Sequence, residues 1–325
     1  MPLRRSLRLQ GLIITIPQHI RRASDTVLWA PLAVYNTAEC MFLIMEDCSW
    51  LSLISLSHVN CAGRNRVRHM VSKCISHALQ PFITTSEHRD ALFTKLDILH
   101  GGITGSIVWA MMNPQTILSR NDQLRDLNIL TPRDTLEQWR AFLSTIDYSQ
   151  ELSTDTRYPF LETSDITQHF HRDAILSSPK GLTITVTQSR TDTVIPVLIS
   201  ATITSQMNLL TSSHIFCAYP TLAATNRSIS TFFPPSGKTM IRVWDCLMRF
   251  SYSTCSWMIP CGSACPAIWR YSYGLGGFGE FAWGGFYNER DIKGNMGDST
   301  ILRSSHFKWR IGDFCWNAYC PNSSC

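Results

Sequence analysis

The last 85 residues of this 325-residue chain constrain its fold most, because they combine clustered cysteines with a loss of regular periodicity. Seven of the 12 cysteines lie after residue 240, among closely spaced tryptophans and glycines. A segment without regular helices or strands buries little apolar surface by itself, so it needs a cross-link or a metal to hold one structure. We treat 241–325 as a Cys/Trp/Gly-rich C-terminal region.

Two cysteine clusters in this region have spacings that metal sites use. Cys261 and Cys265 are separated by three residues, and Cys315, Cys320 and Cys325 are separated by four residues each. Structural zinc takes four thiolate or imidazole ligands, often in pairs two to four residues apart. A Cys₄ zinc site is therefore one interpretation, and free thiols are a second. Disulfides are the third, and the two glycosylation sequons would suit an exported chain.

Composition excludes two classes of protein. Hydrophobic residues make up 44% of the chain and charged residues 16%, against about 25% charged in ordinary globular chains. Disorder throughout needs low hydrophobicity and high net charge, so it is excluded. A membrane span needs about 20 mostly apolar residues in a row. The longest apolar runs, such as Leu12–Ile16, fall far short of that.

The net charge of +5 comes from the first 22 residues, which hold five arginines and no acid. The remaining residues balance 24 bases against 24 acids, so we expect neither nucleic acid nor a membrane as partner. Residues 1–36 form a basic leader, which predicts a disordered arm or a mitochondrial targeting segment. Its apolar run is too short for a secretory signal. We therefore expect an intracellular protein, cytoplasmic or nuclear.

Apolar residues at helical spacing predict three packed helices over 37–82. Ser49 is the expected N-cap of the second helix, and Pro81 is expected to stop the third. The inner face of the third helix is expected to consist of Val67, Val71, Ile75 and Leu79. Cysteines 40, 48, 61, 74 and 217 are interpreted as small core residues.

Residues 83–240 mix helices and strands, which predicts an α+β domain. Helices are expected at 92–99, 107–112 and 135–144, and strands at 124–130, 182–187, 194–199 and 213–218. The alternation of threonine with aliphatic residues at 182–187 predicts a half-buried strand. Pro196 places the strand at 194–199 on a sheet edge. Residues 148–180 are expected to form a polar loop.

Five segments carry a family resemblance. They are WLSLISLSHVNCAGRNRVRHMVSKCISHALQPF (50–82), ITGS (103–106), RDLNILTP (125–132), ITVTQS (184–189) and MNLLTSSHIFCAYPTL (207–222). Together they resemble an uncharacterised family of mushroom-forming fungi that pairs an F-box-like helical segment with a nucleotidyltransferase-like region. The resemblance implies a three-helix F-box-like segment at 37–82 and a nucleotidyltransferase-like mixed sheet at 83–240.

An F-box-like segment implies docking of an apolar helix surface onto the adaptor subunit of a cullin-type ubiquitin ligase. The surface would comprise Leu51, Leu53, Ile54, Leu56 and Val59. The usual Leu-Pro opening is absent, and the third helix lacks a tryptophan. The alternative is that these residues pack against the chain's own second domain.

A nucleotidyltransferase needs a Gly-Ser turn for the triphosphate and carboxylates on neighbouring strands for two divalent cations. Gly105 and Ser106 match the turn, and Asp126 matches the first carboxylate. Asn128 stands where the second carboxylate belongs, and the strand at 182–187 offers no third. The motif is therefore interpreted as catalytically degenerate.

The sequence thus favours a non-enzymatic interaction protein, an F-box-like substrate adaptor for ubiquitination on a degenerate nucleotidyltransferase-like scaffold. A divergent metal-dependent nucleotidyltransferase and a zinc-stapled binding module are the two alternatives. No cofactor other than zinc is expected.

Overall fold

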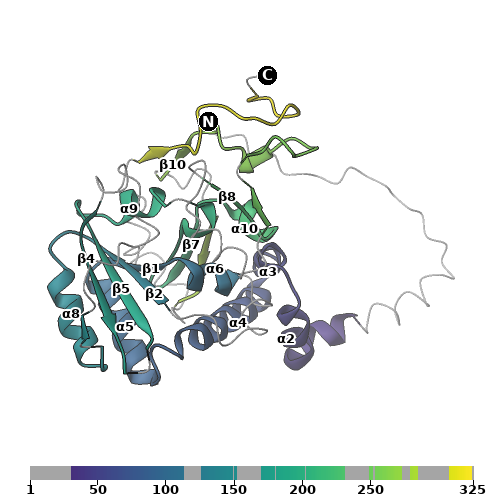
Figure 1. Ribbon diagram of the computed structural model, residues 1–325. Coiled ribbons are helices and arrows are strands. Elements are labelled where there is room, and N and C mark those ends of the chain that lie inside the picture. The colour runs from purple at the N-terminus through teal and green to yellow at the C-terminus, as the bar shows by residue number, and fades with distance from the viewer. Residues whose placement is uncertain are drawn as a thin grey trace, which may run out of the picture. The chain divides into compact units, whose positions relative to one another are not determined.

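The structure is a computed structural model that describes residues 31–112, 126–148, 150–151, 170–179, 181–201, 203–230, 249–251, 253–272, 279–284 and 307–323 (Figure 1). The chain divides into two compact units, Met1–Met45 and Glu46–Cys325. Most of the expected basic leader lies outside the described residues. Among the described residues, no helix combines the length and the apolar character that a membrane crossing requires.

The helices expected over 37–82 are present as α2 (Ala38–Glu46), α3 (Trp50–Ser57) and α4 (Cys61–Leu79). Ser49 is the N-cap of α3, since its hydroxyl accepts the Ser52 backbone N–H at 3.3 Å. Asn60 caps α4 in the same way, through the Gly63 N–H at 2.8 Å. α4 ends two residues before Pro81, as expected.

The inner face of α4 matches its sequence pattern, but the cysteines differ from the expectation. The four residues expected on that face are all buried: Val67, Val71, Ile75 and Leu79. Of the five cysteines interpreted as core residues, Cys217 is buried and Cys61 is exposed. Cys61 is the first residue of α4, where the side chain has no preceding turn to pack against.

The division into compact units does not follow the expected boundary at residue 82. α4 contacts α6 (Ser106–Met112), and the Trp50 ring of α3 lies 5.7 Å from the Phe281 ring in an edge-to-face arrangement. Arg68 donates from Nε to the Ala282 carbonyl at 3.1 Å. The helices α3 and α4 therefore belong to the same compact unit as the sheet that follows them.

The fold is mixed α+β, built on a sheet whose eight described strands have the order β11-β7-β6-β1-β2-β5-β4-β3. The strands are β1 (Gly102–Thr104), β2 (Asp126–Thr131), β3 (Gln150–Glu151), β4 (Phe170–Ser177), β5 (Thr183–Ser189), β6 (Asn208–Leu210), β7 (His214–Cys217) and β11 (Gly279–Ala282). Within this sheet β2 and β5 are parallel and the other neighbours are antiparallel. β11 comes from the C-terminal region and covers the edge of β7.

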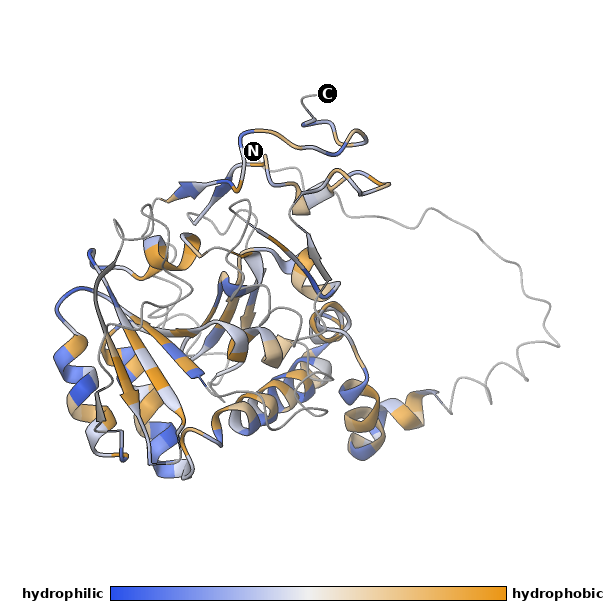
Figure 2. Ribbon diagram, in the orientation of Figure 1, coloured by the Kyte–Doolittle hydropathy of each residue, from blue (hydrophilic) through white to orange (hydrophobic). Residues whose placement is uncertain are grey.

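Two helices adjoin the strands in the middle of the chain. α5 (Ser86–Ile98) leads into β1, and α8 (Leu136–Ser144) follows β2 and packs on β4 and β5. Hydrophobic and hydrophilic residues alternate along α8 in Figure 2, and its buried residues are Leu136, Trp139 and Leu143. The Trp139 indole N–H donates to the Thr131 hydroxyl at 2.8 Å, which links α8 to the end of β2.

Three parts of the expected secondary structure were wrong. The strand expected at 194–199 is the helix α9 (Ile195–Ile199), because Pro196 in its first turn suits a helix start as well as a sheet edge. The loop expected at 148–180 contains β4. Thr185 and Thr187 of β5 are buried rather than half-exposed, since β5 lies between two strands and pairs in parallel with β2.

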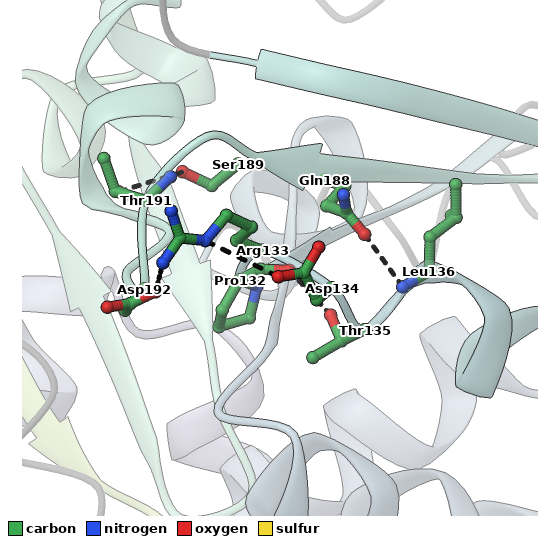
Figure 3. A network of polar contacts seen from close by, with 9 residues as sticks. All are labelled: Pro132, Arg133, Asp134, Thr135, Leu136, Gln188, Ser189, Thr191 and Asp192. Carbon is green, nitrogen blue, oxygen red and sulfur yellow. Dashed lines mark hydrogen bonds and ion pairs between the residues drawn. The ribbon is translucent and has the colours of Figure 1, made fainter.

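The loops that follow the two parallel strands are joined by a polar network (Figure 3). Gln188 of β5 accepts the Leu136 backbone N–H at 3.0 Å and so caps α8 from a neighbouring strand. Arg133 donates its backbone N–H to the Thr191 carbonyl at 2.9 Å, and its guanidinium pairs with Asp192 at 3.1 Å. These contacts fix the start of α8 against β5.

The remaining described elements are short. They are α10 (Pro220–Ala224), η2 (Thr204–Gln206), η3 (Gly262–Ala264), the parallel pair β8 (Arg227–Ile229) and β9 (Arg249–Ser251), and the antiparallel pair β10 (Arg270–Tyr271) and β12 (Lys308–Trp309). The last pair, with η3, lies in the region where the sequence loses regular periodicity.

Candidate metal centre

Four cysteines from two distant segments meet in the C-terminal region. A tight turn places the first two: the Ala264 N–H donates to the Cys261 carbonyl at 3.0 Å and the Cys265 N–H to the Gly262 carbonyl at 3.2 Å. Gly262 has φ of 53°, a conformation that glycine adopts without steric cost. Cys261 and Cys265 therefore flank one short 3₁₀ turn.

The second pair lies in the loop after β12. The Cys315 N–H donates to the Asn322 carbonyl at 3.2 Å, which closes this loop on itself. Inside it, the Cys320 N–H donates to the Asn317 carbonyl at 2.9 Å. The loop thus turns Cys315 and Cys320 toward the same point as the first pair.

The four sulfur atoms of Cys261, Cys265, Cys315 and Cys320 all lie within 4.8 Å of one another, and all four residues are buried. The closest approaches are 3.5 Å between Cys261 and Cys315 and 3.6 Å between Cys265 and Cys320. A tetrahedral zinc site with Zn–S bonds of about 2.3 Å separates its sulfurs by about 3.8 Å. These four thiols therefore have the spacing of a tetrahedral ligand set.

Polar side chains surround the sulfurs. The Asn317 amide donates to Cys261 Sγ at 3.2 Å and to the Ile259 carbonyl at 2.7 Å. The Asn322 amide lies 3.6 Å from Cys265 Sγ, and the Thr254 hydroxyl lies 3.3 Å from Cys315 Sγ. Donors of this kind stabilise and orient metal-bound thiolates. Sequence reasoning missed all three, although the two asparagines lie within two residues of Cys315 and Cys320.

The thiols differ in acidity. Burial raises the pKa of Cys261 to about 12 and that of Cys265 to about 11. Desolvation also acts to raise the pKa of Cys320, but hydrogen bonds with the Asn322 backbone and the Cys265 thiol outweigh it and lower that pKa to about 7. Metal binding needs thiolates, so a cation in the cluster would displace protons from the other thiols.

The distances between the sulfur atoms can be compared with the three interpretations that the sequence left open, which are a zinc site, free thiols and disulfides. The cysteines are free thiols in this structure, since a disulfide needs about 2.05 Å between sulfurs. The cluster that could hold a metal comprises four of the five cysteines proposed from sequence. Cys325, the fifth, lies outside the described residues.

The residues that the sequence matched to a nucleotidyltransferase motif also lie close together. β1 and β2 pair antiparallel with Thr104 opposite Asn128, so the turn at Gly105 lies beside the Asp-x-Asn strand. Gly105 has φ of 85°, and a Cβ at this position would lie 3.0 Å from the Asn128 amide nitrogen. That amide donates to the Asp126 carboxylate at 3.2 Å. Ser106 begins α6 directly after the turn.

The apolar surface expected for ubiquitin-ligase docking is divided between the interior and the exterior. Leu53 is 2% exposed, Ile54 and Leu56 are half-buried, and Leu51 and Val59 are exposed. Leu53 lies on the side of α3 that also buries Trp50. An aspartate at Leu53 would therefore test the packing of α3 rather than a docking surface.

Comparison of the chain with protein-family models, with curated proteins and with solved structures found no match.

Proposed function

We propose that this chain is a binding protein whose C-terminal region folds around one structural zinc ion, held by Cys261, Cys265, Cys315 and Cys320. The observation that carries the proposal is the convergence of four buried sulfurs within 4.8 Å of one another. Sites that bind zinc through four protein ligands are structural, because they leave no position open for substrate or water. The ion's role would be to join two segments that have little regular structure.

The proposal is tested by measuring the metal content of the purified full-length chain. We expect about one zinc per chain, and less than about 0.3 would reject the site. Cys265→Ser should abolish stoichiometric zinc, whereas Cys255→Ser should retain it, because Cys255 is exposed and outside the cluster. Cobalt(II) substitution adds a second readout: the absorption of a tetrahedral thiolate site should appear with the parent chain and the Cys255 variant only.

We propose further that the sheet is a nucleotidyltransferase-like scaffold without the metal ligands that catalysis requires. The support is the antiparallel register of β1 and β2, which sets the Gly105 turn against Asn128. A neutral amide contributes no negative charge at the position where a two-cation centre needs a carboxylate.

This second proposal predicts no transfer activity. We expect no incorporation when the chain is incubated with labelled nucleoside triphosphates, magnesium and a mixed pool of acceptors. The Asp126→Asn variant should be indistinguishable from the parent chain. Incorporation by the parent that disappears in Asp126→Asn would instead identify a working nucleotidyltransferase and overturn the proposal.

Docking of α3 onto the adaptor subunit of a ubiquitin ligase stays a prediction, and of its expected surface Leu51 and Val59 are exposed while Leu53 is buried.

A further inference from the structure

The antiparallel pair β10–β12, with the residues that flank it, forms a two-stranded ribbon with two unlike faces. Arg270 pairs with Trp309 and Tyr271 with Lys308. Arg270 and Trp309 are buried. The Arg270 guanidinium lies 4.0 Å from the centre of the Tyr219 ring, and Trp309 joins an apolar cluster with Tyr219 and Leu222. This face attaches the ribbon to the body of the compact unit.

The opposite face carries two rings and two cations. Side chains alternate along a strand, so Trp269, Tyr271, Lys308 and Arg310 share the face opposite Arg270 and Trp309. Trp269 is 42% exposed and Tyr271 44%, and Lys308 is exposed. Trp269 and Tyr271 are two residues apart, so the points where their rings attach to the strand are about 6.6 Å apart.

Trp269 holds both cations in place. Lys308 Nζ lies 4.2 Å and the Arg310 guanidinium carbon 4.4 Å from the centre of the Trp269 ring. Lys308 Nζ also lies 5.6 Å from the Tyr271 ring centre. Cation–π contacts restrain these long side chains before a ligand arrives, which lowers the entropy lost on binding. Arg310 also pairs with the exposed Asp313, and a ligand anion would compete with that contact.

We propose that this face binds single-stranded nucleic acid, with Lys308 and Arg310 at the phosphates and the two rings beside the bases. Basic side chains combined with aromatic platforms are the usual means of holding single strands without reading their sequence. An acidic peptide would use the cations but would offer no planar group to the exposed Tyr271 ring. The charges of the chain after its first 22 residues sum to zero, so the net charge gives no sign of this surface. Binding of a nucleic acid depends on the local charge of the surface that it contacts rather than on the net charge of the chain.

The proposal rests on the proposed function in one respect. Pro266, next to Cys265, accepts the Ile311 and Gly312 N–H groups at 3.1 and 3.2 Å, which ties the base of the ribbon to the metal centre. Zinc would therefore fix the strands that present the rings and cations. The ribbon also has contacts that do not involve the metal, in its strand pairing and in the packing of its buried face.

The test measures binding of the zinc-loaded full-length chain to fluorescein-labelled (dT)₂₀ and (rU)₂₀ by fluorescence anisotropy at two salt concentrations. The double variant Lys308→Ala/Arg310→Ala should bind at least about tenfold more weakly. The slope of the logarithm of the binding constant against the logarithm of the salt concentration should be smaller in magnitude by about 1.4. Tyr271→Ala should weaken binding by about 5- to 150-fold. The matched control, Lys73→Ala/Arg140→Ala on α4 and α8, should bind as the parent does.

Three results would overturn the proposal. One is unchanged affinity in the Lys308/Arg310 variant, which would assign binding to other basic residues such as the five N-terminal arginines. Another is equal competition by polyglutamate, which would mark the face as a site for acidic proteins. The third is equal or tighter binding of duplex DNA.

Zinc content distinguishes the failure of this proposal from the failure of the proposed function. Loss of binding in the ribbon variants with about one zinc per chain assigns the effect to the surface itself. Binding that depends on Lys308 and Tyr271 in a chain without zinc would sustain the nucleic-acid surface and reject the metal centre.

Discussion

Removal of zinc is expected to speed tryptic cleavage after Arg270 by at least about tenfold, because the ribbon loses the metal centre at its base. Arg270 is 2% exposed, so trypsin reaches its peptide bond only when the ribbon opens. Structural zinc contributes apparent binding free energies of about 10–16 kcal/mol in small domains. The side chains packed against the cysteine cluster, such as Trp257 and Ile268, are only partly buried.

The measurement is limited proteolysis with mass spectrometry, with and without a zinc chelator. Cys265→Ser should be cleaved rapidly in both conditions, and Cys255→Ser should behave as the parent chain. Lowering the pH should release the zinc, because protons compete with the metal for the thiolates, and the metal content of the chain should fall as the pH falls. Equal cleavage rates with and without chelator would show that no metal holds the ribbon.

Truncation of Trp139 is expected to destabilise the sheet by about 3–5 kcal/mol, the range for removing a buried tryptophan side chain. Trp139 is fully buried in α8, its ring packs edge-on against Phe142 at 6.0 Å, and its N–H reaches Thr131. Trp139→Ala leaves a cavity between α8 and the strands, whereas Trp139→Phe removes mainly the hydrogen bond and should cost about 0.5–1.5 kcal/mol.

Urea unfolding followed by circular dichroism checks these values. Trp316→Ala is the matched control, since Trp316 is 55% exposed, and its midpoint should lie close to that of the parent chain. A Trp139→Ala variant that is as stable as the control would mean that α8 is not anchored through this side chain.

The sequence predicted correctly those elements whose structure depends on residues that are close together in the chain. The Ser49 cap, the inner face of α4 and the helix at Ser106–Met112 each depend on residues within one or two turns. The turn at Gly105 was expected from the match of Gly105 and Ser106 to the family motif, and glycine suits it because the backbone there has a positive φ.

Contacts between distant residues decided the parts that were missed. Pro196 is compatible with both a sheet edge and a helix start, and burial against Leu209 and Phe216 selects the helix. The cap of α8 is Gln188, 52 residues away, so no local pattern could reveal it. At the candidate metal centre, cysteine spacing predicted the ligands, but the supporting Asn317 and the ribbon surface emerge only when two remote segments meet.

The position of β11 at the edge of the sheet has a consequence for self-association. β11 pairs with β7 through four residue pairs, from Gly279–Cys217 to Ala282–His214. Without it, β7 would present unpaired N–H and C=O groups along a strand that contains Ile215 and Phe216, which is a template for joining a second chain. A chain shortened before residue 279 would therefore tend to aggregate through β7, so the C-terminal region also protects the sheet from pairing with other copies of itself.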